Sequence, residues 1–320
     1  MKLIFMGTPE SAVPTLRRCV EAGHEILSVW TQPDRPAGRG NRLKAPLVKE
    51  FALSQGLVVH QPTKIKTEES LALFNEREFD VAVVVAYGRI LPPSFLRAPR
   101  LGCVNVHFSL LPKYRGAAPV NWALVRGERE TGVTTMLMDR GLDTGPILLQ
   151  SVTTIEDGET APHLLERLSH VGAELLVETL SRLEEIEPRA QQNEEATLAP
   201  ILRREDGLID WSLDATEIEQ RVRGFQPWPN AFTTHHGRRL IIWRAEVLGR
   251  EVGFGDAVTL TTEAGAAAGR LVVVRGDDLV VVCGEGTTLK LLEVQPEGKQ
   301  RMRARDFING SRVQAGEKLG

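Results

Sequence analysis

The sequence predicts an α/β domain built on a doubly wound parallel sheet, followed by a small antiparallel β-barrel domain. Over the first half of the 320 residues, short β-branched runs alternate with segments of helical periodicity, which is typical of parallel βαβ units. In the last third, strand-like runs are separated by glycine-rich turns, as in a small antiparallel barrel. The chain is also longer than one hydrophobic core usually supports, so two domains are expected.

The first domain is predicted to be Rossmann-like. The run from Asp80 to Tyr87 is apolar almost throughout, as expected of a central parallel strand with helices on both faces. Ser11–Gly23 fits the first crossover helix, because Pro14 is tolerated in a first turn and Gly23 supplies a stop. Apolar residues at helical spacing predict a long closing helix from Ala161 to about Glu185. The strand candidates are Leu3–Met6, Ile26–Thr31, Val58–His60, Val81–Ala86, Cys103–Phe108 and Val133–Met138.

The second domain is predicted to be an OB-like antiparallel barrel. The polar, aperiodic stretch Glu187–Thr197 is typical of a linker, so we expect domains at 1–186 and 207–320 joined by residues 187–206. Asp214 and Glu217 have the spacing of a capping box, which predicts a helix to about Gly224. The strand candidates are Leu240–Val247, Gly269–Val274, Leu279–Cys283 and Thr288–Val294.

Composition and charge bear on the cellular compartment and on the kinds of partner that the protein can have. The three cysteines show no CxxC spacing, which argues against a disulfide framework and a thiolate-rich zinc site and favours a reducing compartment. No run of eighteen apolar residues and no leader-like N-terminus occurs, so a cytoplasmic protein without a membrane partner is expected. The net charge of −3 does not indicate a nucleic-acid partner, although five basic residues against one acid occupy Pro33–Lys49.

The motif that carries chemistry is NVHFSLLPKYRG, Asn105–Gly116, followed by DRGLDTG, which contains Asp143. Asn105 and His107 lie near the carboxyl end of a predicted strand, where open α/β sheets bind ligands, and their spacing of two places them on one face. An amide, an imidazole and a carboxylate suit acyl transfer to an amine. Such residues at a strand end also often bond only local backbone, so residue types alone leave both interpretations open.

The spelling Asn-x-His-x-Ser-Leu-Leu-Pro with a downstream Asp-Thr-Gly loop resembles the folate-dependent formyltransferases, which include enzymes acting on glycinamide ribonucleotide, amino sugars and methionyl-tRNA. The resemblance implies that Asn105, His107 and Asp143 are the catalytic trio. Phe108 stands where a small residue is expected, so its ring is expected to reshape the pocket slightly. Arg89 is assigned through its backbone more than its side chain. The residues implied at the folate site are Ser109, Leu110, Leu111, Pro112, Arg89, Ile90 and Leu91.

Three features resemble the branch of this family that acts on methionyl-tRNA. The basic loop Thr31–Gly40, TQPDRPAGRG, resembles an insertion that folds against the acceptor arm, which implies tRNA contacts by Arg39, with Arg35 and Arg42 beside it. The others are RGAAP, starting at Arg115, and an appended domain containing IDWS and FQPWPNAF. Without the resemblance, the loop reads as plain surface, RGAAP as a helix start, and the tryptophans of the appended domain as packing.

The turn Gly7-Thr8-Pro9 lacks the GxGxxG pattern, which argues against a dinucleotide site. It is either a tight strand-to-helix turn or a wall on the amine-substrate side of the site.

The expected function is transfer of the formyl group of 10-formyltetrahydrofolate to the α-amino group of methionyl-initiator tRNA, which supplies formylmethionyl-tRNA for translation initiation. The folate is a co-substrate, no metal is required, and a monomer is expected. The main alternative is an amino-sugar N-formyltransferase with the same donor, which would not need the basic loop. A non-catalytic tRNA-binding protein is disfavoured by the intact trio of Asn105, His107 and Asp143.

Overall fold

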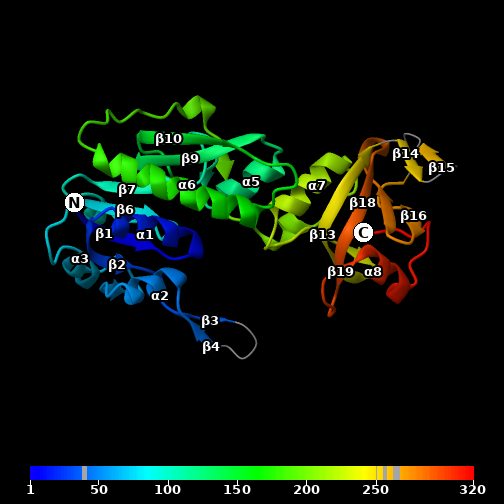
Figure 1. Cartoon of the computed structure of the whole chain (residues 1–320), viewed down its shortest axis with the longest axis horizontal. Coiled ribbons are helices and arrows are strands. Elements are labelled where there is room, and N and C mark those ends of the chain that lie inside the picture. Colours follow the sequence, from blue (N-terminus) through cyan, green and yellow to red (C-terminus); the bar gives the residue numbers. More distant parts are fainter. Residues whose placement is uncertain (38–41, 250, 255–257, 262–266) are drawn as a thin grey trace. The chain divides into compact units, whose positions relative to one another are not determined.

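The structure, a computed structural model, describes residues 1–37, 42–249, 251–254, 258–261 and 267–320 (Figure 1). The chain folds into two compact units. The first comprises Met1–Pro119, Glu130–Ile155 and His163–Pro200, and the second comprises Val120–Arg129, Glu156–Pro162 and Ile201–Gly320. No helix among the described residues has the length and apolar character needed to cross a membrane.

A seven-stranded sheet forms the centre of the first unit, in the order β10-β9-β7-β6-β1-β2-β5. The strands β5, β2, β1, β6 and β7 run parallel to one another. At the other edge, β9 runs antiparallel to β7, and β10 runs antiparallel to β9. The order reverses between β1 and β6, which is where open α/β sheets form a ligand crevice. The bounds are β1 (Lys2–Gly7), β2 (Glu25–Trp30), β5 (Val59–His60), β6 (Val81–Val85), β7 (Cys103–His107), β9 (Glu130–Leu137) and β10 (Ile147–Thr154).

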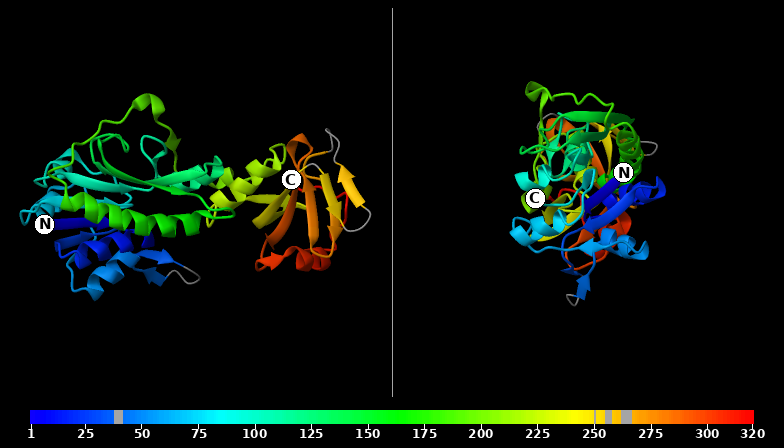
Figure 2. Two further views of the ribbon diagram at one scale, coloured as in Figure 1. Left: turned by 45° about the horizontal axis from the view of Figure 1, so that its top comes forward. Right: turned by 90° about the vertical axis from the view of Figure 1, so that its left-hand side faces the viewer.

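Helices cover both faces of this sheet, which confirms the doubly wound fold. Helices α1 (Val13–Glu21) and α6 (Ala161–Ser181) share one face, joined by an ion pair of 2.6 Å between Arg18 Nε and Glu174 Oε1 (Figure 2). On the other face, α3 (Glu68–Phe74) and α4 (Pro93–Leu96) pack aromatic rings against Trp30 of β2. The remaining helix, α2 (Leu47–Ser54), contacts α1.

The basic excursion after β2 contains an antiparallel pair, β3 (Arg35–Ala37) and β4 (Arg42–Lys44). Arg39, the principal predicted tRNA contact, lies outside the described residues. Arg42 is described through its place in β4 but not through its side chain, and Arg35 is exposed at the start of β3.

The second unit contains an antiparallel sheet, in the order β12-β13-β18-β17-β16, with β19 beside β18. The predicted helix is confirmed: Asp214 caps α7 (Ala215–Gly224) by accepting a 2.9 Å hydrogen bond from the Glu217 amide. Trp211 is buried in the core, whereas Trp228 is 52% exposed. The other bounds are α5 (Pro119–Val125), β12 (Phe232–His235), β13 (Arg238–Gly249), β14 (Glu251–Phe254), β15 (Val258–Thr261), β16 (Leu271–Arg275), β17 (Asp278–Val282), β18 (Thr288–Pro296), β19 (Met302–Arg303) and α8 (Ala304–Ser311).

Part of the predicted linker, residues 187–206, hydrogen-bonds to the first unit. The backbones of Arg189 and Ile147 form an antiparallel bridge, with both N···O distances 2.8 Å. The short strand β11 (Leu198–Ala199) then pairs in parallel with β8 (Arg115–Gly116), directly after the NVHFSLLP motif. These contacts attach the polar stretch to the sheet domain, while the domain limits at 186 and 207 stay a prediction.

Candidate active site

Strand β7 carries Asn105 and His107 on the same face, with 8% and 6% of their surfaces exposed. Pairing to β6 and β9 on either side fixes the register, with Asn105 opposite Val84 and Met136. Alternation sends Phe108 to the other face, where its ring lies near Gly172 of α6. The ring of Phe108 thus lies against this helix, and its effect on the pocket stays a prediction.

The imidazole of His107 lies between a backbone carbonyl and a carboxylate. Its Nε2 is 2.9 Å from the carbonyl oxygen of Tyr114, and because a carbonyl can only accept, Nε2 carries a proton. Its Nδ1 faces the Oδ2 of Asp143 at 3.8 Å. The structure therefore brings His107 and Asp143 together, although they lie in separate motifs.

The carboxamide of Asn105 is not used by the fold. Within the part of the chain that the structure describes, no protein group hydrogen-bonds it, although the residue is buried. Although the residue as a whole is buried, its amide atoms keep some exposure to solvent, so the carboxamide is free to receive a ligand oxygen. Among the described residues Asn105 bonds no local backbone group, whereas His107 bonds the Tyr114 carbonyl, and the catalytic role of both stays a prediction.

The loop after β9 holds Asp143 in a left-handed conformation, with φ 53°. Its Oδ2 accepts a hydrogen bond of 2.8 Å from the backbone amide of Gly116, which fixes the carboxylate beside the imidazole. Gly145 closes the loop where a Cβ would lie 1.8 Å from the carbonyl oxygen of Leu137. In the Asp-Thr-Gly sequence, the glycine is thus required by the backbone geometry, while the aspartate supplies the carboxylate.

The loop that carries Asp143 is held by polar side chains that the sequence analysis did not identify. The Nε2 of Gln191 donates to the backbone oxygens of Asp143 and Gly145, at 2.8 and 2.7 Å. The Oε1 of Gln191 accepts a 3.0 Å hydrogen bond from Nε of Arg115, a buried residue whose guanidinium also donates to Oδ1 of Asn193. Gln191 and Asn193 belong to the stretch predicted as linker, so no local pattern indicated their role.

The SLLP segment forms a tightly bonded turn. The hydroxyl of Ser109 donates to the carbonyl of Lys113 at 2.7 Å, and Ser109 is fully buried. Thr134 of β9 donates to the carbonyl of Ser109 and accepts from the amide of Leu111. The Leu111–Pro112 peptide is cis. Ser109 and Leu111 therefore shape the turn, and the predicted folate contact of Ser109–Pro112 stays a prediction about the surface that this turn presents.

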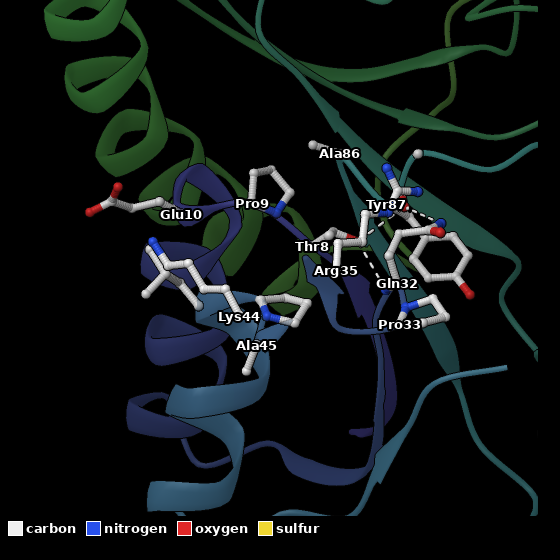
Figure 3. Close-up of a pocket in the computed structure, with 13 residues that line it drawn as sticks. Thr8, Pro9, Glu10, Gln32, Pro33, Arg35, Lys44, Ala45, Ala86 and Tyr87 are labelled. Atoms are coloured by element: carbon white, nitrogen blue, oxygen red, sulfur yellow. Dashed lines mark hydrogen bonds between the residues drawn. The ribbon is translucent and has the colours of Figure 1, made fainter. Parts of the chain in front are cut away.

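A cavity of about 500 Å³ opens at the carboxyl ends of β1, β2 and β6, at the switch point of the sheet (Figure 3). The hydroxyl of Thr8 donates a hydrogen bond of 3.1 Å to the carbonyl of Tyr87 and accepts one from the backbone amide of Gln32. A Cβ on Gly7 would lie 2.8 Å from the ring of Phe5, so only glycine permits this turn. The Gly7-Thr8-Pro9 segment is thus both a tight turn and a wall of the cavity. Other lining residues are Pro9, Glu10, Pro33, Arg35, Lys44, Ala45, Pro46, Leu47, Ala86 and Gly88.

A second cavity, of about 560 Å³, is lined by residues 63–67 together with Arg89 and Ile90. The guanidinium of Arg89 donates to Oε1 of Gln32 at 3.1 Å and to the carbonyl of Thr63 at 2.8 Å. Gln32 therefore links the two cavities. Ile90 is 75% exposed and Leu91 is buried. The three residues of the predicted pterin segment thus point in different directions, and their ligand contacts stay a prediction.

The comparisons with known families agree over most of the chain. A family model described as formyl transferase matches residues 1–180, and one described as the formyl transferase C-terminal domain matches residues 201–312. A methionyl-tRNA formyltransferase of Koribacter versatilis is 50% identical over 323 residues, covering 100% of this chain and 99% of that protein. One from Caldanaerobacter subterraneus subsp. tengcongensis is 46% identical over 319 residues, covering 99% of each.

Solved structures share the fold at lower identity. An N-formyltransferase from Helicobacter canadensis in complex with folinic acid and dTDP-3-aminofucose superposes with a TM-score of 0.67 at 18% identity, covering 92% of this chain and 99% of that one. HypX from Aquifex aeolicus in complex with tetrahydrofolic acid superposes with a TM-score of 0.63 at 14% identity, covering 99% of this chain and 48% of that one.

Proposed function

This chain belongs to the formyl transferase family, and on that premise we propose that it transfers a formyl group to the amino group of methionyl-tRNA. The observation that carries the proposal is the identity of 46–50%, over nearly the whole of each chain, with methionyl-tRNA formyltransferases. The sugar N-formyltransferase superposes at only 18% identity, which speaks for the fold and not for the substrate. The product, formylmethionyl-initiator tRNA, serves translation initiation, which implies a place in the cytoplasm.

The formyl donor is a folate, and we propose 10-formyltetrahydrofolate, which supplies an activated formyl group on N10. Complexes of related folds with folinic acid and tetrahydrofolic acid support this class of donor. The turn Ser109–Pro112 and the segment Arg89–Leu91 would border it. Lys64 and Lys66 line the second cavity, and their ammonium groups would suit the carboxylates of the folate tail.

The reaction forms a bond between the methionine nitrogen and the formyl carbon and breaks the bond from that carbon to N10. One proton leaves the amine and one reaches N10. A free α-amino group has a pKa of about 8, so about one tenth is already neutral at pH 7, and the amine needs positioning more than a strong base. The catalytic demand is therefore mostly to stabilise the oxyanion that develops on the formyl oxygen.

We propose that Asn105 and His107 meet that demand. The buried carboxamide of Asn105 can donate to the oxyanion without giving up a protein hydrogen bond. Because Nε2 of His107 is committed to the Tyr114 carbonyl, only Nδ1 is free, and it donates to the oxyanion only in the imidazolium form. Asp143, at 3.8 Å from Nδ1, would balance that charge and accept the amine proton directly or through water.

The acceptor end of the tRNA is proposed to enter from the first cavity. Its wall combines proline, alanine and leucine side chains with Arg35 and Lys44, which would suit an apolar amino acid esterified to a phosphate-bearing strand. Arg39 and Arg42, with Arg35, are proposed to contact the acceptor arm as the loop spelling implies. The tRNA acts as substrate and no metal enters this scheme. We expect the enzyme to act as a monomer.

The test is a formylation assay on the full chain with 10-formyltetrahydrofolate and either methionyl-initiator tRNA or a nucleotide-linked amino sugar. We expect turnover with the charged tRNA and none with the sugar. Turnover with the sugar alone would establish the alternative. Tight tRNA binding without formyl transfer to either acceptor would show a non-catalytic protein.

A further inference from the structure

Two histidines and a glutamate gather in the second unit, in a cluster that the proposed reaction does not use. His235, His236 and Glu317 each offer one atom, and these atoms lie within 4.8 Å of one another. The Nε2 atoms of His235 and His236 are 2.7 and 3.3 Å from Oε2 of Glu317. Across the described ranges, with their gaps, no other group of His, Cys, Asp and Glu has this geometry.

The backbone explains how adjacent histidines reach one carboxylate. His235 ends β12 and pairs with Arg238 across a two-residue turn formed by His236 and Gly237. Both turn residues have positive φ, 50° and 72°, as the tightest hairpin turns require. Successive side chains on a regular strand point to opposite faces, but this turn brings the two rings to a centroid distance of 4.2 Å.

Glu317 is held in place by hydrogen bonds from the backbone amides of Leu271 and Gln314. Its backbone oxygen accepts a hydrogen bond of 2.8 Å from the Leu271 amide. Its Oε1 accepts one of 3.0 Å from the Gln314 amide, which leaves Oε2 turned toward both imidazoles. The amide of Gly320 also bonds the carbonyl of Thr234 in β12, at 3.0 Å. The carboxylate is therefore fixed in position before any ligand arrives.

We propose that His235, His236 and Glu317 bind one divalent transition-metal ion, Zn²⁺ in the first instance, with a fourth position open to water. Two imidazoles and one carboxylate form a donor set that Zn²⁺ favours. Bonds of about 2.0 to 2.1 Å in a tetrahedron place neighbouring ligand atoms roughly 3.3 Å apart. The 3.3 Å between His236 and Glu317 already fits this spacing.

Of the two distances to Glu317, only the shorter must change for the ion to enter. The 2.7 Å between Nε2 of His235 and Oε2 of Glu317 is a hydrogen bond, and it would have to widen by roughly 0.6 Å. The side chain of His236 is 69% exposed, so its ring is free to adjust and the ion has a path from solvent. The buried His235 provides the fixed ligand on the opposite side.

A bound ion would cross-link two distant segments of the second unit. The ion would join the β12–β13 turn to a segment 82 residues later in the chain. An ion that binds the folded state and not the unfolded chain stabilises the fold in proportion to the logarithm of its concentration. Hard cations such as Mg²⁺ and Ca²⁺ prefer all-oxygen ligands and should not bind this set.

The experiment is calorimetric titration of ZnCl₂ into the full chain, prepared without a polyhistidine tag and stripped with a chelator, together with thermal unfolding. His236→Asn removes the imidazole while keeping a residue that tolerates positive φ, so the turn should survive. Glu317→Gln removes the charge and keeps the size. His170→Asn, on the exposed surface of α6, is the matched control.

We expect one Zn²⁺ per chain with micromolar or tighter affinity and a rise of Tm with zinc, for both the parent and His170→Asn. In His236→Asn and Glu317→Gln the affinity for zinc should fall by more than roughly tenfold. A loss of about tenfold is typical even when a residue that only supports a metal ligand is changed, and these two variants remove a ligand itself. Tm should no longer respond. No zinc uptake by the parent, equal uptake by His236→Asn, or equally tight binding of Mg²⁺ would each overturn the proposal.

Discussion

The side-chain amide of Gln191 donates a hydrogen bond of 2.8 Å to the backbone oxygen of Asp143, and a second of 2.7 Å to that of Gly145. Gln191 comes after α6, whereas Asp143 lies in the loop after β9. The conformation of the loop that carries Asp143 is therefore set partly by Gln191, which lies 48 residues later in the chain.

Gln191→Ala should lower kcat by about tenfold to a hundredfold, because a small displacement of a positioned group is enough to cost that much. The KM for the folate donor should change little, since Gln191 bonds the loop that carries Asp143 and not the SLLP turn. Steady-state kinetics would measure both. Gln192→Ala, at an exposed neighbouring position, is the matched control. An unchanged kcat in Gln191→Ala would show that the loop keeps its geometry without this clamp.

Asn105→Ala, His107→Ala and Asp143→Ala should each reduce kcat by about a hundredfold or more, equivalent to roughly 3 kcal/mol of lost transition-state stabilisation. Asp143→Asn separates charge from geometry, because asparagine tolerates the positive φ and still accepts from Gly116. Circular dichroism should show unchanged folding. Near-normal turnover in any variant would remove that residue from the trio.

Gly116→Ala should lower both stability and kcat. Gly116 has a φ of 128°, and a Cβ there would lie 2.4 Å from the carbonyl oxygen of Ala199. Such overpacking typically costs about 1 to 3 kcal/mol, and relieving it would move the amide that holds Asp143. Urea unfolding gives the stability. Gly158→Ala, with a φ of 73° but no atom within 4 Å of the added Cβ, isolates backbone strain from the clash. Equal losses in both variants would contradict this explanation.

The three cysteines should resist alkylation in the native protein. Burial raises the pKa of Cys19, Cys103 and Cys283 to about 12. Because the thiolate is the nucleophile, only on the order of one thiol in ten thousand would be reactive at pH 8. Mass spectrometry after iodoacetamide treatment should find no label until the chain is unfolded, when all three should react. Rapid labelling of the folded chain would mean that a thiol is accessible.

Arg39→Ala should weaken the reaction with methionyl-tRNA while leaving folate affinity unchanged, because the basic loop is proposed to bind acceptor phosphates. The logarithm of kcat/KM should fall less steeply with the logarithm of salt concentration, by about one unit for each phosphate that the variant no longer binds. Arg39→Lys keeps the charge and should retain most of that slope. A salt series on parent and variants decides the matter, and identical slopes would leave the loop as surface.

The sequence predicted the sheet well because its signals are local. Val81–Val85 is a run of buried β-branched and small residues, and the predicted strand agrees with it within one residue. Alternation sufficed to put Asn105 and His107 on one face of the strand, and it agrees with the position of the Phe108 ring near Gly172. No bounds were predicted for strand β10, because its residues past Leu148 are partly buried or exposed at the edge of the sheet and mix polar with apolar types.

What the sequence could not predict depends on contacts between distant segments. Arg115 and Gln191 are polar residues without a periodic pattern, and their roles appear only when the chain returns beside β8. The pairing of His236 with Glu317 likewise needs the fold, since neither residue belongs to a motif. Polar residues in an aperiodic stretch look like solvent-exposed linker until their partners are known.

The pairing of β11 with β8 bears on how small a working catalytic fragment can be made. A fragment cut at the end of the family match, residue 180, would retain every strand of the seven-stranded sheet yet lose Gln191, Asn193 and β11. Such a piece would leave the Asp143 loop without the hydrogen bonds from Gln191. It would also separate α5 from α7, where the carbonyl of Gly224 accepts a 2.7 Å hydrogen bond from Asn121. The contacts that hold the Asp143 loop therefore extend to about Pro200, some twenty residues past the end of the family match.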